Sequence, residues 1–287
     1  SFRNLRSIMK FGIYNSLAGF FRRGVVTAPD MIIGKLGTPT QVGLFSRGLG
    51  FIEFVSQSLM MGVKPVVLPY LSEVQRSGDD VNDAYIRASV MLGAILWPIL
   101  AVASIVSLPS IQLFFGDQWD AAAPYATLIS YWAMFRSVHW FSSDLMVARG
   151  QEKLMVVKEG LMFVFYFCGI ALAYPLGLLA VAGVFVVAGL ADLLGTTWLL
   201  TRFLGLRPTQ MLKAWLGNAL LTLVCWVVAD LIFVDGSADS VGISSSFWAV
   251  AAVLPLVWLT TLFVVRHPLR HEILHLLRWV RSRYINT

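Results

Sequence analysis

The first long apolar stretch of the chain reads LRSIMKFGIYNSLAGFFRRGVVTAPDMIIGKLG (residues 5–37), and it carries Arg22, Arg23 and Asp30. A helix over residues 11–33 is about 33 Å long at ~1.5 Å per residue, which is enough to cross a bilayer. A charged side chain in hydrocarbon costs on the order of several kcal/mol, so such residues usually face a bundle interior or a wet cavity. The polar positions of this helix fall on one arc, and they are Asn15, Ser16, Gly19, Arg22, Arg23, Thr27 and Asp30. The pattern therefore predicts a spanning helix that forms one wall of an anion-accepting cavity inside the membrane.

Composition supports a membrane protein. Of the 287 residues, 57% are hydrophobic and 13% are charged, and the mean hydropathy is +0.74. Soluble domains carry about 25% charged residues. The net charge of +6 does not indicate nucleic acid binding, because basic residues in membrane proteins mostly record topology. Cys168 and Cys225 lie in apolar runs and are interpreted as packing residues. The first residue is Ser1 rather than Met, and we expect the chain to be a portion of a longer protein.

Hydropathy predicts an all-α, polytopic transmembrane helix bundle of about eight spans. The predicted spans are residues 8–36, 44–71, 84–107, 121–148, 155–174, 178–204, 211–233 and 247–265. Most of the 22 basic residues fall on one side of this arrangement, including Arg149, Lys153 and Lys158 after the fourth span. The positive-inside rule then places both termini in the cytoplasm.

Two further predicted spans carry polar stripes at helical spacing. The second has Ser46, Gly50, Glu53, Gln57, Met60 and Lys64 on one arc, and the fourth has Tyr125, Trp132, Arg136, His139, Trp140 and Ser143, with Asp144 at the edge. Arginine binds phosphate with two parallel hydrogen bonds, lysine acts as a point charge, and aromatic faces stack on sugar rings. The candidate substrate-binding residues are Arg22, Arg23, Lys64, Arg136, Trp132 and Trp140. The candidates for coupling to protons or another cation are Asp30, Glu53, His139 and Asp144.

Structural roles remain as alternatives at each of these positions. Arg22 and Arg23 could pair with carboxylates, and Lys64 could extend to the membrane surface. Glu53 could be a structural partner of Lys64 or of an arginine. His139, Trp132 and Trp140 could be packing residues, and helix–helix hydrogen bonding is favoured for Asp192.

The basic tail, residues 266–287, has histidines at positions 267, 271 and 275. That spacing could hold a metal, but the residues around it favour an amphipathic helix on an anionic membrane surface, namely Leu276, Leu277, Trp279, Arg281 and Arg283. The sequence shows no nucleophile elbow, phosphate loop or metalloprotease motif. We therefore expect no catalytic residue, no metal site, no cofactor and no enzymatic activity.

Four segments resemble, in order, a signature of the polysaccharide-transporter flippases. They are PDMIIGKLGTPTQVGLFSRG (29–48), with Phe45 where Tyr is usual, VVLPYLSEVQRSGDDVNDAYIRA (66–88), LFFGDQWDAAAPY (113–125) and MFRSVHWFSSDLMVARGQ (134–151). These O-antigen flippases belong to the multidrug/oligosaccharidyl-lipid/polysaccharide flippase superfamily. The resemblance covers residues 29–151, and hydropathy alone describes the chain beyond them.

The resemblance implies the second half of a two-bundle flippase fold. Residues 1–204 would be the C-terminal six-helix bundle, residues 205–265 two additional helices, and residues 266–287 a cytoplasmic tail. It further implies transport of undecaprenyl-diphosphate-linked polysaccharide or O-antigen repeat units across the bacterial inner membrane by alternating access. The implied partners are this lipid-linked oligosaccharide, the bilayer, an N-terminal helix bundle of the same protein and the polysaccharide assembly machinery.

Other functions remain open. A multidrug or cation antiporter of the same superfamily would need an acidic cavity, whereas the predicted cavity is net cationic. A membrane-embedded polysaccharide polymerase or ligase would need reactive residues in a sizeable outer loop, and the predicted outer loops are short. A scaffold without transport activity would fill its polar stripes with mutual salt bridges.

Overall fold

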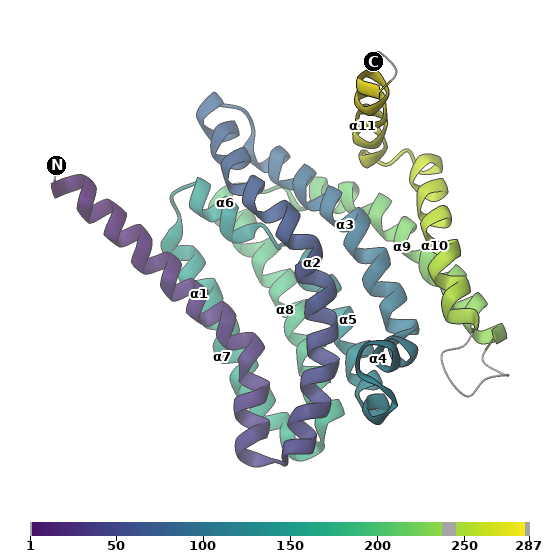
Figure 1. Cartoon of the computed structure of the whole chain (residues 1–287). Helices are drawn as coiled ribbons and strands as arrows, with labels where there is room; N and C mark the ends of the chain where they lie inside the picture. Colours follow the sequence, from purple (N-terminus) through teal and green to yellow (C-terminus); the bar gives the residue numbers. More distant parts are fainter. Residues whose placement is uncertain (1, 237–244, 285–287) are drawn as a thin grey trace.

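The computed structural model describes residues 2–236 and 245–284 of the chain. These residues form eleven α-helices and two short 3-10 helices, with no strand among them (Figure 1). The elements are α1 (Phe2–Leu36), α2 (Pro39–Ser77), α3 (Val81–Ile105), α4 (Ser107–Phe115), η1 (Asp117–Ala122), α5 (Ala123–Ser137), α6 (Ser142–Ala148), α7 (Glu152–Ala173), η2 (Tyr174–Leu176), α8 (Leu178–Leu204), α9 (Pro208–Gly236), α10 (Ser245–Val264) and α11 (Leu269–Tyr284). The all-α, polytopic bundle expected from hydropathy is confirmed.

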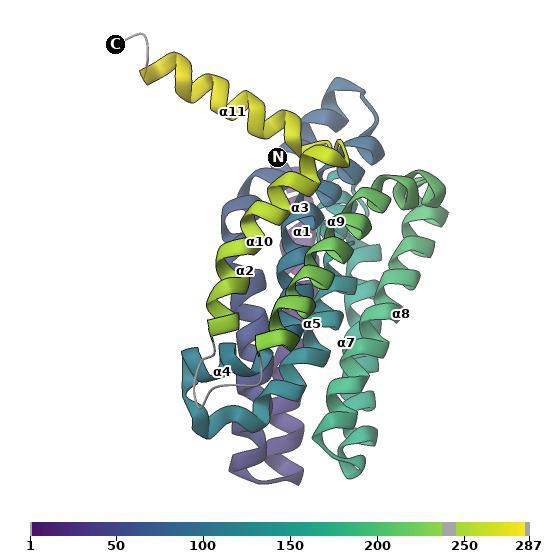
Figure 2. The ribbon, with the colours of Figure 1, turned by 90° about the vertical axis from the view of Figure 1, so that its right-hand side faces the viewer.

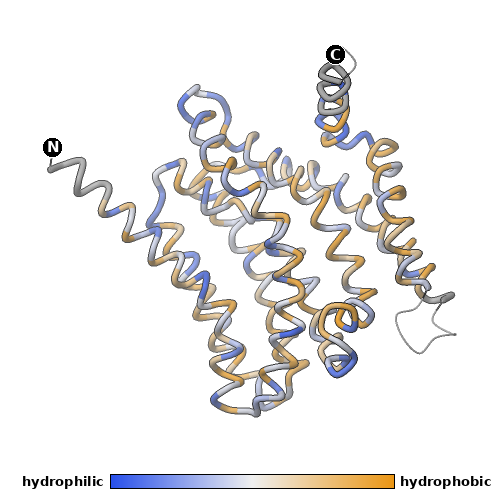
Figure 3. Tube along the Cα trace, in the orientation of Figure 1, coloured by the Kyte–Doolittle hydropathy of each residue, from blue (hydrophilic) through white to orange (hydrophobic). Residues whose placement is uncertain are grey.

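Six of the described helices are long and apolar enough to cross a membrane. They are α2, α3, α7 extended by η2, α8, α9 and α10. The first and fourth predicted spans are not among them. α1 carries Lys10, Arg22, Arg23, Asp30 and Lys35, and the fourth span is divided into α5 and α6. Figure 3 shows hydrophobic residues along much of α3 and α10 and hydrophilic residues at the α2–α3 turn.

The fourth predicted span is interrupted where the Met134 carbonyl accepts hydrogen bonds from two side chains, Ser137 of the same helix and Trp97 of α3. Trp97 Nε1 of α3 donates to the Met134 carbonyl at 2.9 Å and to Ser137 Oγ at 3.0 Å. The amide of Val138 then bonds the Phe135 carbonyl at 3.4 Å in place of the Met134 carbonyl four residues back. Residues 138–141 form turns, and the chain resumes a helix at Ser142. The prediction of one continuous helix over residues 121–148 was wrong for this reason.

The bundle is centred on α5, which packs against α2, α3 and α8. Its core contains the fully buried side chains of Trp132, Phe45 and Phe185, among others. α1 packs mainly on α7, and α9 packs on α3 and carries α10 on its other side (Figures 1 and 2). α10 and α9 thus extend the bundle sideways.

The α1–α2 hairpin is fixed by a capping box. The backbone N–H of Gln41 donates to Thr38 Oγ1 at 3.3 Å, and the backbone N–H of Thr38 donates to Gln41 Oε1 at 3.0 Å. From this hairpin α1 and α2 diverge toward the other end of the bundle (Figure 1). At that other end lie the α2–α3, α6–α7 and α8–α9 connections, together with α11 (Figures 1 and 2).

Two side chains, Lys158 and His267, lie in surroundings that differ from those predicted from the sequence. Lys158, counted in the sequence among loop residues, is instead a buried residue of α7. His267, considered for a metal, is buried in the corner between α10 and α11, where its Nε2 lies 2.8 Å from Asn218 Oδ1 of α9. Among the described residues no group of histidine, cysteine and carboxylate side chains is arranged to hold a metal. The side chains of Leu276, Leu277, Trp279, Arg281 and Arg283, on which the amphipathic interpretation depends, lie outside the described part of the structure.

Candidate functional site

A polar cavity of about 90 Å³ lies inside the bundle, between α1, α2, α5, α6, α7 and α8. A cavity of this size holds several water molecules. Its lining consists almost entirely of polar and charged side chains, namely Arg22, Gln57, Lys64, Arg136, His139, Trp140, Ser142, Ser143, Asp144, Lys158, Glu159 and Asp192. Six of the residues proposed from the sequence are therefore brought together: Arg22, Lys64, Arg136, His139, Trp140 and Asp144.

Arg136 is held on both faces and along one edge. Its guanidinium lies 4.9 Å from the ring centre of Trp132 and 5.1 Å from that of Trp140. Its Nη1 is 2.9 Å from Glu53 Oε1 of α2, and Gln57 Nε2 donates to the other Glu53 oxygen at 3.1 Å. The positive charge of Arg136 is therefore balanced within the bundle, and the two tryptophan faces are covered by the guanidinium.

Trp132 is fully buried, so its ring has no contact with open space. Its Nε1 donates to the Tyr166 hydroxyl of α7 at 2.5 Å, and its ring packs edge-on against Phe185 of α8 at 5.1 Å. Trp132 consequently serves to anchor Arg136 in this structure.

His139 lies in the turn between α5 and α6, and both of its ring nitrogens are engaged. Nδ1 is 2.7 Å from the Tyr85 hydroxyl of α3, and Nε2 is 2.7 Å from Thr197 Oγ1 of α8. The Thr197 hydroxyl already donates its one proton to the Leu193 carbonyl at 2.7 Å. Thr197 must therefore accept from Nε2–H, so a neutral His139 accepts from the Tyr85 hydroxyl at Nδ1 and links α3 and α8 to the α5–α6 turn.

A buried charge cluster on the far side of the cavity was missed by the sequence analysis. Lys158 Nζ lies 3.3 Å from Asp192 Oδ1 of α8 and 3.5 Å from Glu159 Oε1. Ser143 donates to Glu159 at 3.1 Å, and Thr196 donates to Asp192 at 2.9 Å. The preference for a helix–helix role of Asp192 agrees with this pairing. The signal in the sequence was the Lys-Glu pair at positions 158–159 inside an otherwise apolar run.

Arg22, Lys64 and Asp144 form the edge of the cavity toward α1 and α2. The Nε of Arg22 is buried and has no hydrogen-bond partner, and Arg22 forms no ion pair within the described residues. Lys64 is exposed, and Asp144 interacts electrostatically with both cations. Unlike Arg136 and Lys158, these two cations are not held by a bonded carboxylate in the described part of the chain.

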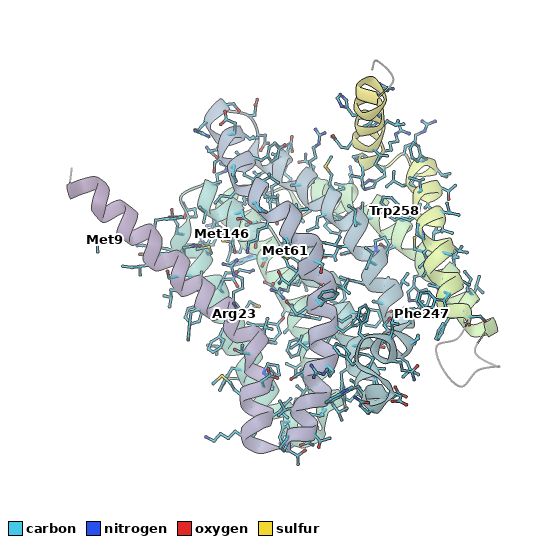
Figure 4. The ribbon with its side chains drawn as sticks, in the orientation of Figure 1. Met9, Arg23, Met61, Met146, Phe247 and Trp258 are labelled. Carbon is cyan, nitrogen blue, oxygen red and sulfur yellow. The ribbon has the colours of Figure 1, made fainter. Side chains whose placement is uncertain are left out.

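The remaining candidates lie elsewhere. Arg23 is exposed on α1, outside the lining of the cavity (Figure 4). Asp30 is exposed near the α1–α2 hairpin, where it accepts a hydrogen bond from Ser46 Oγ at 2.5 Å. Neither residue meets the cluster formed by the other candidates.

Residues 1–124 match a family described as polysaccharide biosynthesis protein. The chain is also similar to the teichuronic acid biosynthesis protein TuaB of Bacillus subtilis (strain 168), with 19% identity over 228 residues. That alignment covers 79% of this chain and 47% of TuaB, so the chain spans about half the length of this relative. The chain is thus similar, over part of its length, to polysaccharide biosynthesis proteins. No solved structure matches it.

The family match covers α1, α2, α3, α4, all of η1 and the first two residues of α5. It therefore includes the α1 and α2 walls of the cavity, with Arg22 and Lys64. Four cations and three carboxylates line the cavity, and a fourth carboxylate, Glu53, pairs with Arg136. The cavity as a whole is thus less cationic than the sequence suggests, and its positive charge is concentrated at the α1–α2 edge.

Proposed function

We propose that this chain is part of a flippase that moves undecaprenyl-diphosphate-linked polysaccharide or O-antigen repeat units across the inner membrane. In this proposal the diphosphate binds at the α1–α2 edge of the cavity, and transport proceeds by alternating access. The partial family match and the similarity to TuaB support a role in polysaccharide biosynthesis or export, and they are compatible with a transporter rather than an enzyme.

The observation that carries the proposal is the unpartnered Nε of Arg22 beside Lys64. A guanidinium without a partner is costly in a membrane interior, and a phosphate would satisfy it through charge-assisted hydrogen bonds. Arg136 and Lys158 are already neutralised by carboxylates, so they would shape the site without binding the diphosphate directly.

The size of the cavity limits what it would hold. About 90 Å³ accommodates water or a phosphate-sized group but not a chain of sugars. We propose that the sugars occupy space between this bundle and a second bundle of the full-length protein. The exposed apolar side chains on α1, namely Met9, Ile13, Leu17 and Phe20, support a further contact on that helix, either with lipid or with protein.

Asp144 is the proposed coupling residue. Glu53 is engaged with Arg136, and Asp30 lies at the hairpin, whereas Asp144 faces both unpaired cations. A phosphate entering between Arg22 and Lys64 would compete with this carboxylate. Protonation or displacement of Asp144 would therefore accompany substrate binding.

Adjacent arginines provide a matched test. In a deletion strain complemented with the full-length gene, Arg22→Gln should lower surface polysaccharide by about ten- to a hundredfold, as expected for loss of a charge-assisted hydrogen bond. Arg23→Gln removes the same charge one residue away, outside the cavity, and should leave the polysaccharide near the wild-type level. Immunoblots of membranes would verify equal insertion. Normal polysaccharide from Arg22→Gln, or equal loss from both variants, would show that the diphosphate does not bind at this edge.

A further inference from the structure

A second cavity, apolar and larger, lies on the opposite side of α2. It has a volume of about 480 Å³, within the range of ~300–1,000 Å³ typical of ligand pockets. We call it the apolar groove; it runs over α3 between α2 and α10, and its lining includes Phe51, Val55, Ile95, Val102, Phe114 and Trp258. Figure 1 shows α3 between α2 and α10. Trp258 lies on the side of α10 that faces α3 (Figure 4), and its Nε1 donates to the Ala94 carbonyl at 2.7 Å.

The length of the apolar groove matches one leaflet of a membrane. Along α3 it extends from Ile95 to Val106, which corresponds to about 17 Å at ~1.5 Å per residue. The hydrocarbon core of a bilayer is about 30 Å thick, so one leaflet provides about 15 Å. A neighbouring cavity shares Ile95 and continues along α3 to Arg87 at the other end. The apolar groove is therefore confined to the half of the bundle that contains α4.

A cation stands beyond the α4 end of the apolar groove. Arg47 precedes Phe51 by four residues and thus lies on the same face of α2. Its guanidinium lies 5.2 Å from the ring centre of Phe115 and 5.0 Å from that of Trp119. Arg47 is exposed and has no carboxylate partner among the described residues. Asp120, which follows Trp119, instead accepts a hydrogen bond from Gln112 Nε2 at 3.0 Å.

The two ends of this face differ in charge. At the far end of the neighbouring cavity, Arg87 is neutralised by Glu272 of α11 at 2.7 Å. At the α4 end, the Arg47 guanidinium lies over two aromatic rings and forms no ion pair with a carboxylate among the described residues, so its N–H groups can bind an anion. Aromatic side chains such as Trp119 are typical of the headgroup level of a membrane.

We propose that the apolar groove binds a phospholipid with an anionic headgroup, whose acyl chains lie along α3 and whose phosphate meets the N–H edge of Arg47. The apolar lining stabilises the chains, and charge complementarity at Arg47 selects the headgroup. This site is on the other side of α2 from the polar cavity, and it does not depend on the proposed flippase activity.

The proposal is tested by measuring lipid retention with native mass spectrometry. The full chain is purified, stripped of lipid and incubated with mixed micelles that contain equal amounts of phosphatidylglycerol and phosphatidylcholine. Wild-type protein should retain phosphatidylglycerol preferentially, and Arg47→Gln should lower that retention about tenfold, as expected for loss of a charge-assisted hydrogen bond. Lys35→Gln removes an exposed cation at the same end of the bundle and should change nothing.

A variant in the apolar groove tests the binding of the acyl chains independently of the headgroup. Ala251 is exposed and lines the groove on α10, so Ala251→Trp fills it without overpacking the core, and it should reduce retention of both lipids. Equal retention of phosphatidylglycerol by wild type and Arg47→Gln would overturn the proposal. So would preferential retention of an added polyprenyl phosphate, or lipid-free dimers that Ala251→Trp disrupts, because these results would assign the groove to another occupant.

Discussion

The Lys158 cluster shows how a buried cation of this protein is neutralised by neighbouring carboxylates. A buried ion pair contributes little net stability, but removing one partner leaves an uncompensated charge. Lys158 faces two carboxylates, Asp192 and Glu159, and each carboxylate accepts a further hydrogen bond from a hydroxyl group. The cluster therefore holds α7 against α8 and is sensitive to the loss of its central ammonium.

Lys158→Met should destabilise the protein by about 3–5 kcal/mol, because both carboxylates would then be buried without a cation. The midpoint of thermal unfolding in detergent measures this effect. Lys153→Met, an exposed position on the same helix, is the matched control and should unfold like the wild type. Combining Lys158→Met with Asp192→Asn and Glu159→Gln should recover much of the loss, and a triple variant as unstable as the single one would contradict this account.

Helical periodicity predicts which residues of one helix share a face, but not which helices meet. Arg136, His139, Trp140 and Asp144 line the same cavity as Arg22 and Lys64, although the first four are divided among α5, the following turn and α6. Arg23 is rotated by about 100° from Arg22 and lies outside that cavity. The pairing of Lys158 with Asp192 depends on the packing of α7 on α8, which no local pattern in the sequence contains.

At the scale of elements, the corner between α10 and α11 is fixed by a relay of hydrogen bonds. The Leu269 amide donates to His267 Nδ1 at 3.1 Å, and His267 Nε2 lies 2.8 Å from Asn218 Oδ1. Asn218 Nδ2 in turn donates to the Val90 carbonyl of α3 at 3.0 Å. Because Nδ1 accepts a hydrogen bond, the relay requires neutral His267.

Burial lowers the pKa of His267 below its usual value of about 6.5. The unfolded corner therefore binds a proton before the folded corner does, so the stability that neutral His267 provides is present above about pH 6.5 and is lost as the pH falls. We expect amide hydrogen exchange of residues 269–275, corrected for its intrinsic pH dependence, to be faster at pH 5.5 than at pH 7.5. His267→Gln should remove most of this pH dependence. Identical pH dependence in the variant would show that another group controls α11.

At the scale of the whole molecule, the ends of the bundle differ in charge. Arg76, Arg149, Lys153, Arg202 and Arg207 belong to the end that contains the α2–α3, α6–α7 and α8–α9 connections (Figure 1). Asp117 and Asp120 belong to η1 at the opposite end. By the positive-inside rule the first end faces the cytoplasm, which remains a prediction of the orientation.

Cysteine labelling would measure the orientation directly. In a Cys168→Ala/Cys225→Ala background, Gln118→Cys in η1 should react with a membrane-impermeant maleimide added outside intact spheroplasts. Ser77→Cys, at the end of α2, should react only after the membrane is permeabilised. The reverse pattern would invert the proposed topology and place the basic tail outside.

Hydropathy alone accounts for most of this architecture but not for two of its parts. The six apolar helices follow from composition, because each must bury its backbone and present apolar side chains to lipid. α1 is charged, and it is integrated through contacts with α7 such as that of Phe21 with Phe163, whose ring centres are 5.7 Å apart. At the interruption between α5 and α6 the Met134 carbonyl accepts from Ser137 nearby and from Trp97 on a distant segment, and a window of local sequence contains only the first of these contacts.

That interruption has an electrostatic consequence. Where a helix stops, the aligned peptide dipoles leave partial negative charge at its C-terminal end and partial positive charge at the N-terminal end of the next helix. Arg136 stands in the last turn of α5 and Asp144 in the first turn of α6, so each charge complements the helix end that bears it. The break thus places partial charges of opposite sign within a few residues of each other. The polar cavity is polarised by the backbone itself, whatever the protonation of its side chains.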